Sequence, residues 1–517
     1  MSMNNEMELK GVFNVEQLEQ LKSLSAIREL AVDKAVSRIL TTTYFDTPDH
    51  ALHKHGYSLR VRKIGKTYTQ CLKRQSEPLG AIIGRTEWEA ELPDQIPQID
   101  LLENKKIRTK IKRLADDNLQ AVFQSVVRRQ SRKLKFEDGT TVSLDIDVGE
   151  VTAGEAVQPI CEFELELLSG SAARIFELAA TINQTVPFRI STVSKAARGY
   201  SLLSKEEPRA QKWRQSKLLK NFTGEQAFVD NLQQAISYLQ ANEESVLLDD
   251  AEGIHQMRVA LRRLRAGLEI FQSNIAPEKY DWIVSEAKWL RDELSAARSW
   301  DVFIDEFVAP VAKISSPAIG FELLLSAAEN ERVLYRKQAR SAINSARYTE
   351  FILGLSTWLY SDIWRDSAAT SKAMELSEPA RKFCAKQLKK QNKIVRENCQ
   401  KLEKMSEEER HKLRLVVKKL RYTIDFCANI YPDKQVLKFQ KTLSPIQSRM
   451  GYLNDVLVAE MLVEKLLGVK PDPATPAWHY SAGIVIGWHR REAKLTAKKL
   501  FKDVNRLLRT RVFWDRK

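Results

Sequence analysis

Residues 6–10 read Glu6-Met7-Glu8-Leu9-Lys10, so charged and apolar residues alternate one by one. Successive side chains of a β-strand point to opposite faces, which would place the charged residues of this stretch on one face and the apolar ones on the other. The same alternation recurs at residues 58–63, 85–92, 141–148 and 162–166. This repetition predicts an antiparallel sheet with one charged face near the N-terminus.

The charged positions of these segments separate by sign. The mainly acidic set comprises Glu6, Glu8, Glu162, Glu164 and Glu166, and the mainly basic set comprises Arg60, Arg62, Lys73 and Arg74. For any single strand, the simpler explanation is an ordinary face exposed to water. Like charges side by side on a strand face repel, however, so the two sets together predict a surface that binds a metal ion and a polyanion.

A barrel of about eight such strands would enclose a lumen wide enough for side chains or one small ligand. Carboxylate oxygens suit Mg²⁺ or Mn²⁺, and proteins usually hold Mg²⁺ with a few carboxylates together with substrate phosphates. Lysine and arginine donate hydrogen bonds to phosphate oxygens. The sequence contains neither a G-x-x-x-x-G-K-[ST] loop nor a Rossmann-type glycine cluster. The charged face therefore predicts a joint site for metal and phosphate.

Five sequence blocks, taken in order, resemble the CYTH domain, the family of triphosphate tunnel metalloenzymes. The blocks are Glu6-Met7-Glu8-Leu9-Lys10, Thr43-Tyr44-Phe45-Asp46-Thr47-Pro48, Leu59-Arg60-Val61-Arg62, Glu162-Phe163-Glu164-Leu165-Glu166 and Ser194-Lys195-Ala196-Ala197-Arg198-Gly199-Tyr200. The resemblance covers about residues 1–204 and implies an α+β domain, an eight-stranded antiparallel β tunnel with helices. It also implies that the tunnel binds a linear triphosphate and a divalent metal ion, and directs water at a phosphorus atom.

The resemblance assigns site residues by their position in these blocks. The residues that match metal-binding carboxylates are Glu6, Glu8, Asp147, Glu162 and Glu164. The residues that match the phosphate-binding, catalytic cations are Lys10, Arg60, Arg62, Lys73, Arg129 and Lys195. The sequence leaves open whether Arg128 or Arg132 replaces Arg129, whether Glu166 replaces Glu164, and which of Glu87 and Glu89 points inward. The expected metal is Mg²⁺, with Mn²⁺ as the alternative.

Length, charge and cysteine content bound the remaining possibilities. A chain of 517 residues is long enough for two or three domains. Most of its net charge of +15 falls after residue 215, which indicates a polyanionic partner for the C-terminal part. The five cysteines form no CxxC pair, so neither a disulfide framework nor a zinc site is indicated. Without a leader or a long apolar segment, we expect a cytoplasmic protein with no membrane contact.

The composition changes near residue 205. Residues 205–218 are polar and charged and indicate a linker. Beyond them, apolar residues recur at the three-and-four spacing of helices, as in residues 228–239, 254–271 and 407–430. We therefore expect an all-α domain over residues 219–510.

The helical half contains an internal duplication with an offset of about 156 residues. The first copy holds His255, Arg258, Arg262, Arg263 and Arg265, and the second holds His411, Arg414, Lys418, Lys419 and Arg421. A second echo links residues 297–302 to residues 451–456. Two helical bundles related by a pseudo-twofold axis are the simplest explanation.

Each copy places a basic stripe on one helix face, because residues at i, i+3, i+7 and i+10 point the same way. The stripes are His255, Arg258, Arg262 and Arg265, and His411, Arg414, Lys418 and Arg421. A third run, from Lys382 to Arg396, has the same spacing and fits an ordinary solvated helix face. Aliphatic residues surround the stripes where nucleic-acid binders place aromatic ones, so a chain of phosphates is the expected ligand and nucleic acid is not.

These two histidine-containing helices resemble the CHAD domain, and the resemblance covers about residues 219–510. It implies binding of inorganic polyphosphate in a basic groove, without catalysis. The order of the two domains resembles that of bacterial inorganic triphosphatases, which implies metal-dependent hydrolysis of inorganic triphosphate to diphosphate and phosphate. The alternatives are hydrolysis of thiamine triphosphate or a nucleoside triphosphate, and a protein that binds polyphosphate or nucleic acid without any enzymatic activity.

Overall fold

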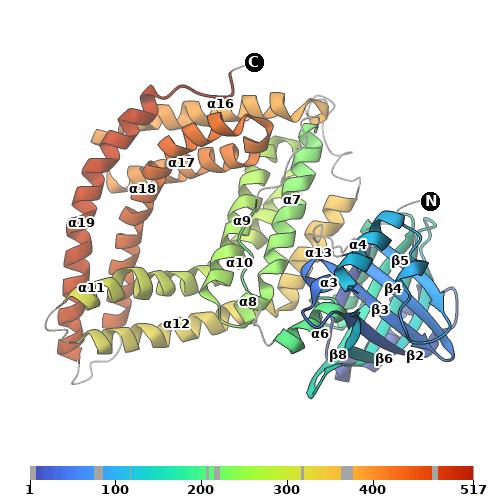
Figure 1. Ribbon diagram of the computed structural model, residues 1–517. Coiled ribbons are helices and arrows are strands. Elements are labelled where there is room, and N and C mark those ends of the chain that lie inside the picture. Colours follow the sequence, from blue (N-terminus) through green and yellow to red (C-terminus); the bar gives the residue numbers. More distant parts are fainter. Residues whose placement is uncertain are drawn as a thin grey trace. The chain divides into compact units, whose positions relative to one another are not determined.

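The computed structural model describes residues 7–74, 86–116, 118–204, 209–214, 222–315, 320–361, 376–468 and 475–515. The chain forms two compact units. The first comprises Met1–Arg209 and Asn344–Ile363, and the second comprises Ala210–Ile343 and Trp364–Lys517. The first unit contains the sheet and the second is helical (Figure 1).

The first unit is built on an antiparallel sheet of nine strands within the described residues, in the order β5-β4-β3-β2-β6-β7-β8-β1-β9. The strands are β1 (Glu8–Val12), β2 (Val36–Asp46), β3 (Tyr57–Ile64), β4 (Thr67–Arg74), β5 (Thr86–Leu92), β6 (Gln120–Lys135), β7 (Thr141–Ala153), β8 (Ala156–Ser169) and β9 (Arg189–Ile190). The predicted antiparallel sheet is confirmed. Its ninth strand has two residues and pairs with Gly11 and Val12 of β1.

Short helices surround this sheet. They are η1 (Val15–Gln17), α1 (Leu18–Ser23), α2 (Ser25–Leu30), α3 (Ala51–Lys54), η2 (Ile99–Leu101), α4 (Lys105–Ala115), α5 (Ala173–Thr185), α6 (Lys195–Ser204) and α13 (Ala346–Tyr360). Helix α5 packs on β8, and α6 packs on β6, β7 and β8. The apolar residues of the alternating strands fill the core, where Leu9, Phe163 and Leu165 are fully buried. The alternation seen in the sequence thus separates an apolar face from a charged one.

The second unit is all-α, as predicted. Its helices are α7 (Gly224–Ala241), α8 (Glu243–Leu247), α9 (Ala251–Phe271), η3 (Gln272–Asn274), α10 (Pro277–Val302), η4 (Phe303–Val308), α11 (Ala309–Ile314), α12 (Phe321–Ile343), α16 (Ala380–Cys399), η5 (Leu402–Lys404), α17 (Glu407–Cys427), η6 (Ala428–Ile430), α18 (Asp433–Leu467) and α19 (Thr475–Arg509). Segment η4 is a π-helix that continues α10.

The packing of these helices follows the sequence duplication. In the first repeat α7 packs on α9, α9 on α10 and α10 on α12, and in the second α16 packs on α17, α17 on α18 and α18 on α19. The repeats meet where α7 contacts α16, α9 contacts α17 and α12 contacts α19. Figure 1 shows these helices arranged as the sides of a frame. The predicted pair of pseudo-symmetric bundles is confirmed.

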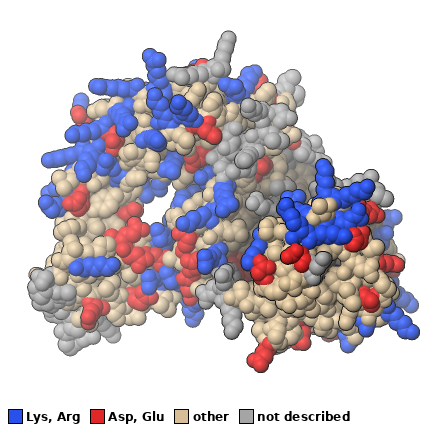
Figure 2. Space-filling view, in the orientation of Figure 1, with Lys and Arg blue, Asp and Glu red and all other residues tan. Residues whose placement is uncertain are grey.

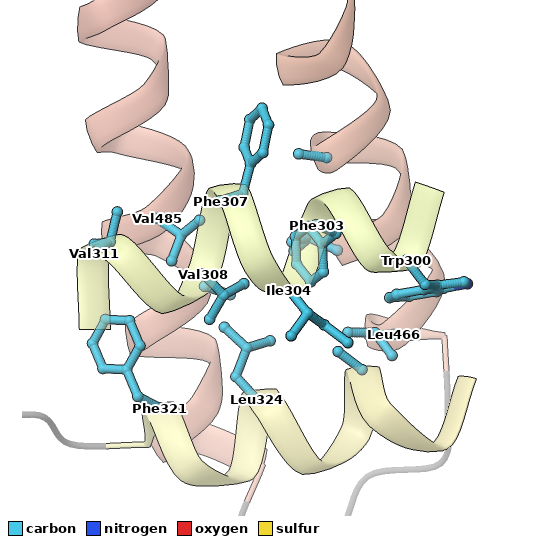
Figure 3. Close-up of a cluster of buried hydrophobic side chains, with 14 of the residues drawn as sticks. Trp300, Phe303, Ile304, Phe307, Val308, Val311, Phe321, Leu324, Leu466 and Val485 are labelled. Atoms are coloured by element: carbon cyan, nitrogen blue, oxygen red, sulfur yellow. The ribbon is translucent and has the colours of Figure 1, made fainter. Parts of the chain in front are cut away.

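A cluster of buried apolar side chains joins the two repeats at one side of this frame. Residues from α10, η4 and α12 pack there against residues from α18 and α19 (Figure 3). Trp300 is 1 % exposed, and Leu324 and Val485 are fully buried. Burial of this much apolar surface fixes the frame on the side opposite to the contact between α9 and α17.

Two segments depart from a plain order of sheet domain, linker and helical domain. Residues 210–214, inside the expected linker, pack on the second unit: the Gln211 amide donates to Asn242 Oδ1 (2.9 Å), and the rings of Trp213 and Tyr238 stack at 4.6 Å. Residues 344–363, which lie in sequence inside the helical half, belong to the first unit. The chain therefore enters the first unit twice.

Candidate functional site

The charged face of the sheet lines a cavity of about 200 Å³ in the first unit. Its walls comprise Glu8, Lys10, Tyr44, Ser58, Arg60, Arg62, Lys73, Arg74, Glu87, Glu89, Arg129, Asp145, Glu164, Glu166, Ser194, Lys195 and Ala196. Strand register explains this gathering, because residues that face each other across an antiparallel ladder point to the same side. Lys10 is paired with Glu164, Arg129 with Asp147, and Arg60 with Cys71.

Most of the acidic and most of the basic residues occupy different strands of this face, and β1 carries both Glu8 and Lys10. Strands β7, β8 and β1 carry most of the carboxylates, and β3 and β4 carry the cations Arg60, Arg62 and Lys73. Beyond β4, strand β5 adds Glu87 and Glu89, and Glu87 forms an ion pair with Lys73. A linear anion bound on β3 and β4 would therefore have carboxylates at both of its sides.

Two buried lysines connect the carboxylates of β7 and β8. Lys195 Nζ lies 2.7 Å from Asp147 Oδ2 and 2.5 Å from Glu162 Oε1. Lys10 Nζ lies 3.3 Å from Glu162 Oε1 and 3.2 Å from Glu164 Oε1. Because Lys10 is only 2 % exposed and Glu162 is fully buried, these contacts are shielded from water.

Arg129 completes this network from the neighbouring strand β6. Its Nη1 lies 2.5 Å from Asp145 Oδ2, and its Nη2 lies 2.6 Å from Asp147 Oδ2 and 2.5 Å from Glu164 Oε2. Its Nε also donates to Asp147 Oδ1 at 2.7 Å, so the guanidinium binds the Asp147 carboxylate in a bidentate manner. Among the three arginines that the sequence left open, Arg129 is the one on the cavity wall.

These contacts shift the ionisation of the buried groups. Burial opposes the ionisation of Glu162, but the attraction of nearby cations, Lys10 first among them, outweighs it and lowers the pKa of Glu162 to about 2. Burial also opposes the protonation of Lys195, yet the carboxylates around it, led by Glu164, raise its pKa above the ordinary value. The charged forms of both residues are therefore stable at neutral pH.

The arginines of β3 have a different environment. Arg60 and Arg62 have no ion-pair partner among the described residues, and the Nε of each is buried without a hydrogen-bond partner there. Repulsion from Arg60, followed by burial, lowers the pKa of Arg62 to about 10. A pair of neighbouring half-buried cations without carboxylate partners attracts an anion.

The structure brings most of the predicted site residues to this cavity. On its wall are Glu8, Glu164, Lys10, Arg60, Arg62, Lys73, Arg129 and Lys195. Asp147 and Glu162 lie behind the wall, fully buried and bonded to the cations just described. Glu166 reaches the wall as well as Glu164, and Glu89 as well as Glu87. Glu6 lies outside the described residues.

Several residues of this region had no predicted site role, among them Asp145, which forms an ion pair with Arg129. Tyr44, Ser58 and Ser194 lie on the wall, and Arg198 Nη2 contacts Glu162 Oε2 at 2.6 Å behind it. Strand alternation could have found Ser58, which shares the face of Arg60. Arg198 could not have been found in this way, because its side chain reaches the network from helix α6.

The carboxylates offer suitable ligands for a divalent cation. Oxygens of Asp147, Glu162 and Glu164 all lie within 4.8 Å of one another, and a second such group combines Cys71 with Glu87 and Glu89. On β1, Glu8 Oε1 is buried and has no hydrogen-bond partner among the described residues. A buried carboxylate oxygen without a donor is destabilising, so Glu8 fits the role of a metal ligand.

In the second unit, the basic stripes of α9 and α17 lie close enough to repel each other. Burial, followed by repulsion from Arg262 and Arg298, lowers the pKa of Arg258 to about 10. Burial, followed by repulsion from Arg414 and Arg262, lowers the pKa of Lys418 to about 8. Arg262 of α9 thus acts on Lys418 of α17, so the structure brings the two stripes together.

Other basic residues of these helices hold the repeats in place. Arg263 Nη2 lies 3.3 Å from Asp425 Oδ2, and Lys419 Nζ lies 3.0 Å from Glu269 Oε2, so both pairs cross from α9 to α17. His411 is exposed, whereas His255 is half-buried. In the third basic run, Arg396 donates to the carbonyls of Leu508 and Thr510, which is a structural role at the end of α19.

The surface of the second unit is strongly basic in places. Figure 2 shows Lys and Arg side chains gathered over the part of this unit formed by α16 and α17, and an opening between the helices with all side chains drawn. Among the described residues, no helix is apolar over a length sufficient to cross a membrane.

Comparison with known proteins identifies both units. The family model of the CYTH domain matches residues 4–200, and that of the CHAD domain matches residues 231–464. The chain therefore carries a CYTH domain followed by a CHAD domain, as the sequence blocks indicated. The crystal structure of the CHAD domain from the plant Ricinus communis supports the helical fold: its TM-score is 0.50 at 24% identity, and the match covers 59% of this chain and 99% of that one.

Curated relatives match shorter stretches. An inorganic triphosphatase of Haemophilus influenzae is 31% identical over 169 residues, which is 32% of this chain and 47% of the relative. An uncharacterized protein of Mycobacterium tuberculosis is 25% identical over 323 residues, which is 58% of this chain and 59% of the relative. The chain thus spans about half the length of the curated relatives it matches.

Proposed function

We propose that the first unit is a metal-dependent triphosphatase that hydrolyses inorganic triphosphate to diphosphate and phosphate. The main support is the arrangement of one cavity. In it, Arg60 and Arg62, which have no ion-pair partner among the described residues, line the same wall as a network of carboxylates and lysines on β7, β8, β1 and α6. The CYTH family and the similarity to an inorganic triphosphatase support the same class of reaction.

In this proposal, the residues divide the work by charge. Arg60, Arg62 and Lys73 bind the phosphate oxygens, where negative charge is spread during phosphoryl transfer. Glu8 and Glu164 hold the divalent metal, Mg²⁺ or Mn²⁺, with Glu6 as a further ligand outside the described residues. When bound, the metal neutralises phosphate charge and orients the attacking water.

Asp147 and Glu162 have a supporting role in this mechanism. Both are fully buried, and their oxygens contact Lys195, Lys10, Arg129 and Arg198 instead of the cavity. They fix the ammonium groups of Lys10 and Lys195 at the wall, where these donate to the terminal phosphate. Fixed donors need no reorganisation during the reaction, which lowers the barrier.

Phosphate release by the purified chain with Mg²⁺ and triphosphate tests this proposal. We expect turnover in the unmodified chain and its loss in Glu8→Gln and Lys10→Ala. Glu150→Gln is the matched control, because Glu150 is an exposed carboxylate on β7 outside the cavity wall. Normal turnover in both cavity variants would refute the mechanism.

The substrate class needs a separate experiment. We favour inorganic triphosphate because the cavity wall is charged almost throughout, and Tyr44 is its single aromatic residue among the described ones. Equal concentrations of inorganic triphosphate, thiamine triphosphate and ATP in one reaction would rank the three by kcat/KM. A preference for either organic substrate would overturn the choice of substrate and keep the reaction class.

We further propose that the second unit binds inorganic polyphosphate along the stripes of α9 and α17. Burial, followed by repulsion from neighbouring cations, lowers the pKa of Arg258 and Lys418, and a bound polyanion relieves this repulsion. Binding of labelled polyphosphate, with single-stranded DNA of equal charge as competitor, tests this. Displacement of polyphosphate by the DNA would favour a nucleic-acid-binding protein instead.

A further inference from the structure

Helix α13 belongs in sequence to the helical half and in structure to the first unit. It begins after the N-cap residue Ser345 and packs against α5 and β9. At its far end, the rings of Tyr360 and Phe176 of α5 stack at 5.3 Å between centroids. The contact is well packed, since Phe176 is fully buried and Phe351 and Ile352 of α13 are too.

The polar contacts of α13 converge on the backbone of Phe188. Thr349 Oγ1 donates to the carbonyl of Phe188 at 2.8 Å, and Asn183 Oδ1 accepts from the amide of Phe188 at 3.3 Å. The same Asn183 donates through Nδ2 to the carbonyl of Ala346 at the start of α13, at 3.2 Å. Thr349 and Asn183 are 2 % and 1 % exposed. Both backbone groups of Phe188 therefore depend on α13 or on a residue that α13 holds.

Phe188 directly precedes β9, which pairs with the strand that carries Lys10. Arg189 is paired with Val12, Ile190 with Gly11, and the Ser191 amide donates to the carbonyl of Lys10 at 2.9 Å. The ring of Phe188 also packs at 4.8 Å against Phe163 of β8. A strand of two residues makes few bonds of its own, so its position depends on what holds its ends.

The same segment leads to the second catalytic lysine of the proposal. Ser194, on the cavity wall, accepts the Ala197 amide, and Lys195 begins α6. Residues 188–195 thus link α13 to both lysines. They reach Lys10 through the pairing of β9 with β1, and Lys195 directly follows this segment in the chain. A shift of this segment would move both ammonium groups away from the phosphate.

We propose that α13 is a brace for the active site of the first unit, with Thr349 and Asn183 as positioning residues for Lys10 and Lys195. The link to catalysis depends on the proposed function, whereas the structural link does not. Loss of the Thr349 hydroxyl leaves the buried carbonyl of Phe188 without its partner, which loosens β9 and then β1.

The test compares Thr349→Val with the unmodified full-length chain by hydrogen exchange and by phosphate release. In Thr349→Val, we expect amide exchange in residues 9–12 and 188–191 to become about tenfold faster, with β3 and β4 unchanged. We also expect kcat to fall about fivefold with little change in KM, because fixed lysines act mainly in the transition state. Thr349→Ser, which keeps the hydroxyl, should restore both values.

Thr357→Val is the matched control, because this hydroxyl on the same helix donates within α13, to the carbonyl of Leu353 at 2.9 Å, and has no other partner in the part of the chain that the structure describes. Unchanged exchange at residues 188–191 in Thr349→Val would overturn the brace. Faster exchange with an unchanged kcat would overturn the positioning role. An unmodified chain that releases no phosphate would instead refute the proposed function, and the exchange comparison would still decide the brace.

Discussion

The two units differ in how their clustered cations are stabilised. In the first unit, the cations Lys10, Lys195 and Arg129 share buried carboxylates, and the pKa of Lys195 lies above its ordinary value. In the second unit, burial and mutual repulsion lower the pKa of Arg258 to about 10 and of Lys418 to about 8. One set of cations is balanced by the protein itself, and the other is not.

This difference fits the two tasks proposed above for the units. Cations fixed by buried carboxylates hold their positions before any substrate arrives, as catalysis requires. When cations repel one another, binding of a polyanion relieves this repulsion and so contributes favourably to affinity. Such binding does not require the cations to keep one fixed geometry. Arg62 shows that the cavity contains both arrangements, because repulsion from Arg60 and burial lower its pKa, as repulsion and burial do for cations of the second unit.

Arg62→Gln gives the largest expected effect on activity. It tests whether a cation of the cavity can be removed with a loss of activity and without a loss of stability. We expect kcat/KM for triphosphate to fall by about 10²- to 10³-fold, since a fixed charge on the transferred phosphate is lost. The melting temperature should stay the same or rise, because the repulsion between Arg62 and Arg60 is relieved. Circular dichroism measures the melting temperature. A large drop in melting temperature together with a loss of activity would show that Arg62 has a structural role.

The pH dependence of unfolding tests the balanced network, with Glu162 as its centre. The pKa of Glu162 is about 2 in the folded protein and near 4.5 in a free side chain, so the folded state binds fewer protons between these values. Its stabilising contribution is therefore complete above pH 4.5 and is lost as the pH falls toward 2. The shift corresponds to about 3 kcal/mol.

Denaturant unfolding of the full-length chain at a series of pH values measures this loss for the first unit. Glu162→Gln should flatten the curve between pH 5 and 2, and should cost about 3–5 kcal/mol at pH 7 because Lys10, Lys195 and Arg198 lose their partner. Glu150→Gln is a control on the same unit, since its carboxylate is exposed and outside the cavity. An unchanged curve in Glu162→Gln would assign the acid sensitivity to other groups.

Sequence predicted the parts of this molecule that follow from periodicity. Alternation predicted the antiparallel sheet and its charged face, and the duplicated histidine and arginine pattern predicted the two helical repeats. The separation of Arg60 and Arg62 from the carboxylates of β7 and β8 also followed, because the charged positions of these three strands on this face each carry one sign.

Contacts between distant segments were beyond the reach of the sequence. Asp147 shares a strand face with Asp145 on β7, yet it is fully buried and contacts Arg129 and Lys195, whereas Asp145 lies on the cavity wall. Helix α13 has an ordinary helical pattern, and nothing in it indicates that it packs on the first unit. The periodicity of apolar residues indicates which face of a helix or strand is buried, but it does not indicate which other element packs on that face.

Arg262→Ala should reduce the affinity of the second unit for polyphosphate by about tenfold, through the loss of a charge-assisted contact. Arg262 lowers the pKa of Lys418, so it also acts between the two stripes. Stability should not fall, in contrast with Glu162→Gln, because Arg262 has no ion-pair partner among the described residues. Binding at several salt concentrations measures the effect, and Arg381→Ala on α16, which lies outside both stripes, is the control. Equal losses in both variants would indicate nonspecific attraction.

Lys418→Arg gives the smallest and most specific effect. Lys418 faces Arg414, Arg262, Arg258 and Asp455, and its pKa of about 8 means that it loses its charge when the pH rises above this value. Polyphosphate favours the charged form, so affinity should fall about fivefold between pH 7 and 9.5 in the unmodified chain. Arginine stays protonated over this range, so Lys418→Arg should retain its affinity. If the affinity of Lys418→Arg fell equally steeply over this pH range, the titrating group would be another residue. The pKa of Lys418 would then have no bearing on binding, and the contrast between the two units would be weaker.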